Sequence, residues 1–157
     1  MRDDPSMISQ KAKYALRALL ALADLDAVSI SAAELAERER IPRKFLEQIL
    51  ADLKRDGLVQ SRRGAAGGYA LLKPADTITF GHVLRLIDGP IAPLPCLSRI
   101  AYRPCEDCED EATCRVRKVF ALVANSARAV LDQTTLADAI AHPGRPLGLP
   151  QDIFGTA

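Results

Sequence analysis

The residues with the most distinctive chemistry in this chain are four cysteines that lie close together. They fall within nineteen residues and are the only cysteines of the sequence: Cys96, Cys105, Cys108 and Cys114. Thiolates gathered in this way can hold a metal ion or an iron–sulfur cluster, or can respond to oxidation. The first fourteen residues carry acids and no apolar run of signal-peptide length, so we expect a cytoplasmic location. Stable disulfides are rare in that reducing compartment, which favours a metal or redox centre.

Three interpretations of these cysteines are open, and we favour a two-iron or four-iron cluster, which four thiolates suit. Zinc is an alternative because Cys105 and Cys108 have the spacing of a zinc pair. Structural zinc sites usually add a second pair or histidines, however, and His82 and His142 lie far from the segment. A clusterless thiol switch is the third interpretation, and five neighbouring acids weaken it because carboxylates raise thiol pKa values. These acids are Glu106, Asp107, Glu109, Asp110 and Glu111.

Length, composition and charge limit the classes of protein to be considered. A chain of 157 residues that is 48% apolar can bury one ordinary core with an appended arm. Its longest apolar run is far below the roughly 20 residues that span a bilayer, so we expect no membrane segment. The net charge is only +1, yet residues 38–73 hold nine Lys or Arg against four Asp or Glu. This basic third predicts a face that binds a polyanion, although solvated helix surfaces can look similar.

The first eighty residues predict three helices and a hairpin. Apolar residues recur at helical spacing over residues 9–25, and a capping box of Ser31 and Glu34 begins a second helix over 32–38. A third helix begins near Pro42 and ends at Gly57. The stretches 58–60 and 69–72 look extended and are joined by the basic turn RRGAAGG. The pattern is a helix-turn-helix followed by a two-stranded wing.

This arrangement suits double-stranded DNA, because a third helix fits the major groove while a glycine-rich hairpin approaches the backbone or minor groove. The candidate DNA contacts are Arg43, Lys44, Glu47, Gln48, Arg62, Arg63, Gly64 and Gly67. Glu47 can accept from cytosine or can instead form an ion pair within its own helix. The alternative for the hairpin is that its glycines only make a turn, and helix-turn-helix geometry also occurs in plain helical cores.

The second half predicts a short helix capped by Thr77 or Thr79, a cysteine loop, and a long helix that begins after Cys114. The long helix carries an apolar stripe, which we call the dimer stripe: Val116, Val119, Phe120, Val123, Ala127 and Val130. A partner subunit is expected to cover it, because helix-turn-helix proteins commonly read two half-sites about 34 Å apart. Packing of the stripe against the first helix is the alternative.

The predicted fold class is therefore mainly α with a small β-hairpin wing: a winged helix-turn-helix domain plus a long C-terminal dimerisation helix. The expected divisions are a DNA-binding domain over 7–90, a cysteine-rich sensor loop over 91–114, and the dimerisation helix with a short terminal helix over 115–140. The Pro- and Gly-rich segment 141–157 is expected to be a disordered tail.

An enzyme is not expected. The sequence has no phosphate-binding glycine loop after a strand, no evident nucleophile with a histidine partner, and two histidines in all. A small electron-transfer protein would account for the cysteines alone. It would leave the basic helix-turn-helix and the wing without a role.

Several segments together resemble one known family. KYALRALLALA, IPRKFLEQILADLKRDGLVQSRRGAAGGYAL, TFGHVLRLIDG, the cysteine loop and TLADAI are similar to the bacterial iron–sulfur cluster regulators of the IscR type. That group also includes sensors of nitric oxide, iron and cysteine metabolism. The resemblance covers residues 7–140. It implies a homodimeric winged-helix regulator, expected to be a repressor, with crossing C-terminal helices and a cluster in the preceding loop that controls operator affinity.

The chain departs from this family at two cluster ligands. Relatives add a histidine or a first-helix aspartate to three cysteines, and the corresponding positions here hold Arg117 and Lys13, neither of which ligates iron. The gap from Cys108 to Cys114 reproduces the family's last spacing, and Cys96 stands for the first ligand. The resemblance thus implies Cys96, Cys108 and Cys114 as ligands, with Cys105 or an exogenous group as the fourth.

Overall fold

The computed structural model describes residues 7–25 and 28–142, and in that part of the chain it has six α-helices and one two-stranded hairpin. The elements in order are α1 (Gln10–Asp24), α2 (Ala32–Glu39), α3 (Arg43–Arg55), β1 (Val59–Arg62), β2 (Gly68–Leu71), η1 (Ala75–Thr77), α4 (Phe80–Asp88), η2 (Pro95–Leu97), α5 (Arg115–Gln133) and α6 (Leu136–Ala141). The predicted fold class is confirmed. Of the segment 141–157 that was expected to be a tail, Ala141 is the last residue of α6 and His142 is its C-cap, and residues 143–157 lie outside the described residues.

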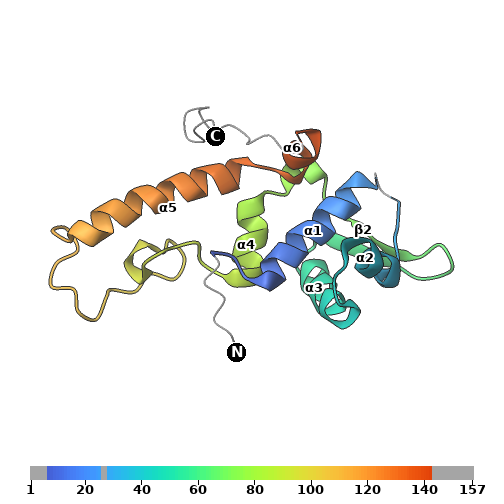
Figure 1. Ribbon diagram of the computed structural model, residues 1–157, viewed down its shortest axis with the longest axis horizontal. Helices are drawn as coiled ribbons and strands as arrows, with labels where there is room; N and C mark the ends of the chain where they lie inside the picture. The colour runs from blue at the N-terminus through green and yellow to red at the C-terminus, as the bar shows by residue number, and fades with distance from the viewer. Residues whose placement is uncertain (1–6, 26–27, 143–157) are drawn as a thin grey trace.

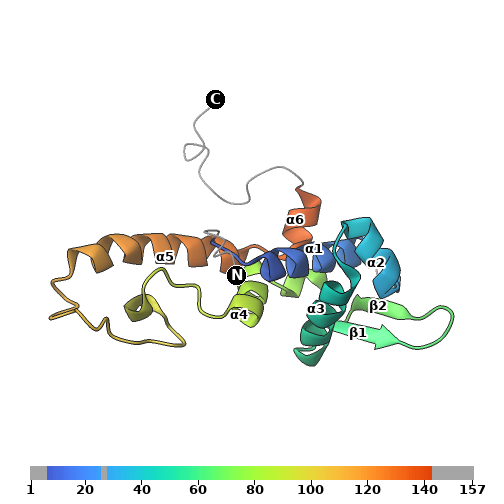
Figure 2. The same cartoon turned by 60° about the horizontal axis from the view of Figure 1, so that its bottom comes forward.

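The molecule is elongated, and its two unusual segments lie at opposite ends. The hairpin extends beyond α2 and α3 at one end, whereas the cysteine loop and the start of α5 form the other end (Figure 1). The same separation is visible after rotation in Figure 2, where β1 and β2 point away from α5. Helices α1 and α4 lie between the hairpin and the cysteine loop and connect these two ends of the molecule.

Side-chain caps fix where α1, α2 and α4 begin, whereas α3 follows Pro42 without such a cap. Ser9 accepts from the Ala12 amide at the start of α1, and Ser31 forms the predicted capping box with Glu34. Thr79, rather than Thr77, caps α4. Each cap satisfies an amide that has no partner within its helix, which is why these local sequence signals located the helix starts well.

The core is built around α1, whose small and apolar residues pack against the apolar side of α3. Tyr14 and Phe45 add an edge-to-face contact between the two helices, with ring centroids 5.7 Å apart. Leu136 of α6 is fully buried in the same cluster, and its amide bonds to the Ile78 carbonyl at 2.9 Å. The chain therefore returns to the core of the winged-helix unit after α5.

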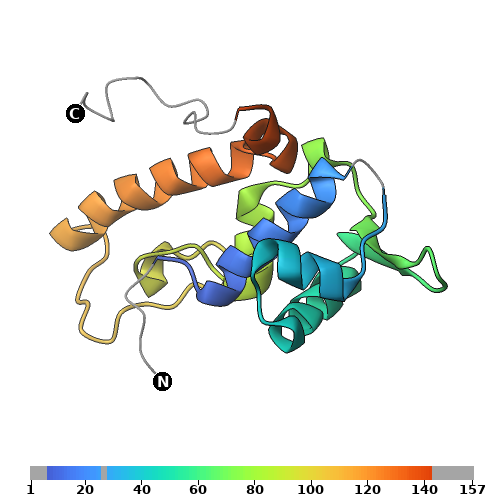
Figure 3. The ribbon, with the colours of Figure 1, turned by 45° about the vertical axis from the view of Figure 1, so that its right-hand side comes forward.

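The hairpin is antiparallel, with Val59 opposite Leu71 and Arg62 opposite Gly68. Its strands are each shifted by one or two residues from the predicted stretches. A bridge between Ile30 and Tyr69 joins the hairpin to the segment before α2. The hairpin thus projects from the helices but is anchored at its base (Figure 3).

Helix α5 packs along α4 and η2 on one side only. Near its first half, the side chains of Val116, Val119, Phe120 and Val123 remain between 40% and 61% exposed. The alternative that the first helix covers this stripe is thus not realised for these four residues. None of the helices in the two described ranges combines the length and apolar character needed to span a membrane.

Candidate DNA-binding surface and cysteine loop

The two sides of helix α3 differ sharply in their exposure to solvent. Its apolar residues Leu46, Ile49, Leu50 and Leu53 are fully buried. The four predicted DNA contacts of the helix, Arg43, Lys44, Glu47 and Gln48, are all exposed near its amino-terminal end. One side of the helix is therefore committed to the core, while the other is available to a partner.

Arg43 and Glu47 bond to each other on this surface. The Arg43 Nε donates to Glu47 Oε1 at 2.9 Å, one helical turn away. The ion pair that was the alternative role of Glu47 is therefore present in the free protein. Both side chains remain largely exposed, and such surface pairs contribute only about 0.3–0.5 kcal/mol, so little free energy opposes their rearrangement.

The tip of the hairpin presents the remaining predicted contacts. Arg62, Arg63 and Gly64 are exposed, and a Cβ on Gly64 would meet open space. Gly67 differs, because a Cβ there would lie within 3.0 Å of the backbone of Arg62, Arg63 and Gly64. The tightness of the turn itself accounts for Gly67, whereas nothing packs against Gly64.

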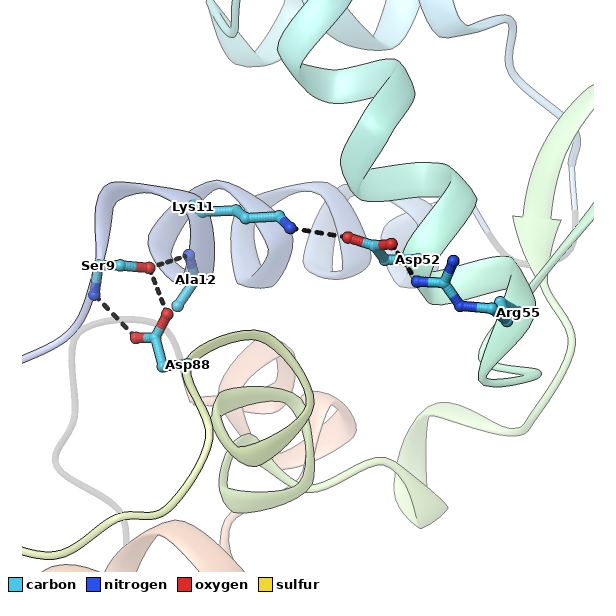
Figure 4. Close-up of polar contacts among 6 residues, drawn as sticks. All are labelled: Ser9, Lys11, Ala12, Asp52, Arg55 and Asp88. Carbon is cyan, nitrogen blue, oxygen red and sulfur yellow. Dashed lines mark hydrogen bonds and ion pairs between the residues drawn. The ribbon is translucent and has the colours of Figure 1, made fainter.

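Sequence reasoning missed the polar contacts that hold α3 in place. Lys11 Nζ of α1 bonds Asp52 Oδ2 of α3 at 2.7 Å, and Asp52 also accepts from Arg55 (Figure 4). The hydrogen bond from Lys11, more than the contact with Arg55, holds the pKa of the Asp52 carboxyl below its usual value. At the same amino-terminal end of α1, the Asp88 carboxylate of α4 accepts from both the amide and the hydroxyl of Ser9.

Two more contacts connect α3 to its surroundings. Lys54 Nζ donates to Ser61 Oγ of β1 at 2.6 Å, and the His82 ring of α4 bonds the Asp56 carboxylate at 2.8 Å. Asp52 and Arg55 are three residues apart on one helix, but the partners in the other pairs are between 7 and 79 residues apart, and helical spacing does not predict those contacts. Together they fix α3 relative to α1, α4 and the wing.

In the cysteine loop, residues 91–114, Cys105 contacts Cys96, and Cys108 lies near Cys114. Cys96 in η2 is buried, and the other three cysteines are partly buried. Burial and the contact with Cys96 raise the pKa of Cys105, while burial and the neighbouring Cys114 raise that of Cys108. Within the described residues, no three His, Cys, Asp or Glu side chains converge as ligands of one metal ion. The loop thus supplies sulfur donors side by side without a closed coordination shell.

Arg117, at the position where the resemblance implied a histidine, lies beside this loop. Its amide donates to Cys114 Sγ at 3.4 Å, so Cys114 caps α5. Its Nε is buried without a hydrogen bond, although the Glu111 carboxylate lies 3.5 Å away. Glu111 in turn accepts from the Tyr102 hydroxyl and raises the Tyr102 pKa. The loop therefore places an incompletely satisfied cation next to its thiols.

A winged helix with a basic reading helix and wing, joined to a thiol loop and a long helix with an exposed apolar stripe, defines a winged-helix transcriptional regulator. The chain belongs to the Rrf2 family, whose sequence model, described as iron-dependent transcriptional regulator, matches residues 8–142. The regulator class expected from the sequence, rather than an enzyme, is confirmed.

Individual relatives support this assignment. The chain is 52% identical over 139 residues to a putative HTH-type transcriptional regulator, rrf2-like, of Rhodobacter capsulatus, across 86% of this chain and 93% of that protein. Among solved structures, CymR, described as the global cysteine regulator of B. subtilis, has a TM-score of 0.71 and 33% identity over 85% of this chain and 95% of that one. T. potens IscR has a TM-score of 0.67 and 27% identity, with 93% of each chain covered. The predicted resemblance to IscR-type regulators is thus confirmed.

Proposed function

We propose that this regulator is a homodimeric repressor that reads its operator with α3 and the wing, and that the cysteine loop sets its operator affinity. The observation that carries the proposal is the division of α3 into a buried apolar side and an exposed side with basic and amide groups. Recognition helices of this class expose such groups to base edges and phosphates in the major groove.

Each exposed group has a role in this proposal. Arg43 and Lys44 contact bases or phosphates at the start of α3, and Gln48 pairs with adenine. Glu47 accepts from cytosine after leaving Arg43. Arg62 and Arg63 contact phosphates or the minor groove from the hairpin tip, where the missing side chain of Gly64 allows close approach.

Replacement of Arg63 by alanine tests this surface. Removal of one phosphate contact should weaken operator binding and reduce the slope of log K against log salt by about one. The measurement is fluorescence anisotropy at several salt concentrations, on a duplex selected from random sequences by the wild-type protein. Arg103→Ala is the matched control, because Arg103 is an exposed arginine of the cysteine loop at the opposite end of the molecule. Wild-type affinity and salt slope in Arg63→Ala would remove the wing from the interface.

The dimer in this proposal forms through the exposed part of α5. Four apolar side chains of the dimer stripe are 40% or more exposed near its start, and Ala127 and Val130 continue the stripe at intermediate exposure. Contiguous exposed apolar area of this kind marks interaction surfaces. A second copy of the chain is the occupant that a reader of two half-sites requires.

The donor chemistry of the loop fits an iron–sulfur cluster. Cys96, Cys105, Cys108 and Cys114 would hold it, and when bound it supplies a centre that oxidants and iron supply can alter. Cys105 is the proposed fourth ligand, because Lys13 is an exposed lysine and Arg117 cannot donate electrons to iron. The Arg117 guanidinium, whose buried Nε has no hydrogen bond, offsets negative charge at the thiols.

A clusterless thiol switch is the second candidate, and a structural zinc site is the third. The similarity to a regulator described as a cysteine regulator supports the second. The thiol pair Cys105 and Cys108, joined by a backbone bond of 3.2 Å from the Cys108 amide to the Cys105 carbonyl, has the local geometry that a zinc pair uses.

Anaerobic reconstitution of the wild type and of the four single Cys→Ala variants separates these candidates. Iron and sulfide with visible absorption, lost in each variant, would support the cluster, and operator affinity should then change while the dimer stays folded. Thr113→Ala, which changes an exposed neighbour of Cys114, is the control and should keep its cluster. Stoichiometric zinc without sulfide would establish the zinc site instead, and no metal in any preparation would leave the thiol switch. Full cluster retention by Cys105→Ala would exclude Cys105 as the fourth ligand.

A further inference from the structure

A small pocket with three arginines lies where α4, α5 and the cysteine loop meet, which we call the arginine pocket. Its volume is about 200 Å³. The residues that line it are Arg85, Pro90, Ile91, Arg99, Ile100, Arg128 and Asp132. It is separate from both the thiols and the exposed side of α3, and neither the fold nor DNA recognition gives it a role.

The charges around the pocket do not balance. Three guanidinium groups face one carboxylate, and that carboxylate is already engaged, because Arg85 donates to Asp132 Oδ1 at 2.6 Å. The pocket therefore has an excess of two positive charges. Gly81 of α4 makes room for this ion pair, since a Cβ at that position would lie closer than 3.0 Å to Asp132 Oδ1.

Arg128 is the most unusual member, because it is only 9% exposed. It donates to the Leu97 carbonyl and, at 3.2 Å, to Asn125 Oδ1, and both acceptors are uncharged. Burial, followed by repulsion from Arg99, lowers its pKa, and Asp132 offsets this only partly. A buried guanidinium is costly unless an anion compensates it, so the site lacks negative charge.

We propose that the arginine pocket binds one small oxyanion with two negative charges, of the sulfate or inorganic phosphate class. Two negative charges match the excess of the three arginines over Asp132. The planar fork of an arginine side chain suits the paired oxygens of such anions. The volume is below the roughly 300–1,000 Å³ of pockets for larger organic ligands, which favours an anion of a few atoms.

The bound anion would link three parts of the chain. Arg85 belongs to α4 of the DNA-binding unit, Arg128 to α5, and Arg99 to the cysteine loop. Arg128 also holds the carbonyl of Leu97, the residue after Cys96. Occupancy would therefore fasten the base of the cysteine loop to α4, and this inference does not depend on the identity of the group at the thiols.

Calorimetric titration of the DNA-free full-length protein with sulfate, at constant ionic strength maintained with chloride, tests the proposal directly. We expect a saturable isotherm with one sulfate per chain, and phosphate should compete for the same site. Arg99→Ala removes an exposed pocket arginine without leaving a buried group unpaired, and it should weaken sulfate binding by roughly tenfold or more. Arg103→Ala removes an exposed loop arginine outside the pocket and should bind as the wild type does.

A second pair of variants should move the affinity in the opposite direction. Asp132→Asn removes the carboxylate that competes for Arg85, so sulfate should bind several-fold more tightly. Asp76→Asn makes the same charge change at an exposed position in η1 and should leave the affinity unchanged. Calorimetry is preferred to thermal shifts, because sulfate stabilises many proteins without binding a site. No saturable binding by the wild type, or equal affinities within either pair of variants, would overturn the proposal.

Discussion

Gly68 offers the sharpest test of how the wing is attached. It opens β2 with a φ of +145°, a conformation that residues with side chains rarely adopt. A Cβ at this position would lie closer than 3.0 Å to the Ile30 carbonyl and at 3.0 Å from the Ser31 amide. These neighbours are backbone atoms and cannot rotate away. Gly68→Ala must therefore separate the hairpin from the segment that leads into α2.

The expected loss can be worked out from the contacts at this junction. Two hydrogen bonds join Ile30 and Tyr69, from the Tyr69 amide at 2.7 Å and from the Ile30 amide at 3.0 Å. Each contributes about 1 kcal/mol net, and the strained backbone of a residue with a side chain adds about 1–2 kcal/mol. Gly68→Ala should thus lower the free energy of unfolding by about 3–4 kcal/mol, a large part of the roughly 5–15 kcal/mol of a typical domain.

Urea unfolding of Gly68→Ala and of Gly64→Ala provides the comparison. Gly64 also has a positive φ, +106°, but a Cβ there meets nothing within 4 Å. Gly64→Ala should therefore show only the backbone strain of about 1–2 kcal/mol. If both substitutions cost the same at equal m-values, the junction with Ile30 does not anchor the wing and the reasoning is wrong.

Two further predictions concern the dimer and the pH dependence of stability. Val123→Glu would bury an unpaired charge in the stripe of each subunit, so dimer dissociation in sedimentation experiments should rise at least about a hundredfold. Ala129→Glu, an exposed position on the other side of α5, should stay dimeric, and a stable Val123→Glu dimer would move the interface elsewhere. The pKa of Asp52 is lowered in the folded state, so its ion pair with Lys11 stabilises the protein above the usual carboxyl pKa of 3.8 and ceases to do so as the pH falls through the lowered value. Lys11→Met should therefore lower the free energy of unfolding in urea by about 0.5–1 kcal/mol at pH 7. The difference between the variant and the wild type should shrink toward about pH 3. A difference that does not change with pH would contradict this role of the ion pair.

The features that the sequence predicted well are those set by neighbours along the chain. The capping box of Ser31 and Glu34 depends on residues three apart, and it appears as predicted. The apolar spacing in α3 likewise predicted its fully buried side, and thereby the exposed side that carries Arg43 and Gln48. Local rules suffice here, because a helix fixes which residues share a face.

The features that the sequence did not predict depend on residues far apart. The bond from Lys11 to Asp52 spans 41 residues, and the clash that requires Gly68 involves Ile30. The sequence predicted that the glycines of the hairpin permit close approach to DNA, yet packing within the molecule explains Gly67 and Gly68. At Gly64 no packing contact excludes a side chain, and only the positive φ of +106° favours glycine.

The cysteine loop has some features that the sequence predicted and others that it did not. Four thiols in a short segment predicted the chemistry, but their arrangement depends on turns such as the bond from the Cys108 amide to the Cys105 carbonyl. Arg128 carried no recognisable signal, because an arginine on an amphipathic helix is expected in solvent. Its burial follows from the path of the loop, which brings the Leu97 carbonyl to it.

The loop and the wing lie at opposite ends of the molecule, which limits how the proposed switch at the thiols would alter operator binding. Within one subunit, a change can pass from the loop to α4 and then to α3, either through Asp88, Ser9, Lys11 and Asp52 or directly from His82 to Asp56. In the proposed dimer, a change would pass between subunits through α5, which Cys114 caps and whose stripe is exposed. The first route would change the order or angle of α3, whereas the second would change the distance between two copies of α3. Affinity for a half-operator should therefore change only if the order or angle of α3 changes. Affinity for full operators of varied half-site spacing should also change if the distance between the two copies of α3 changes.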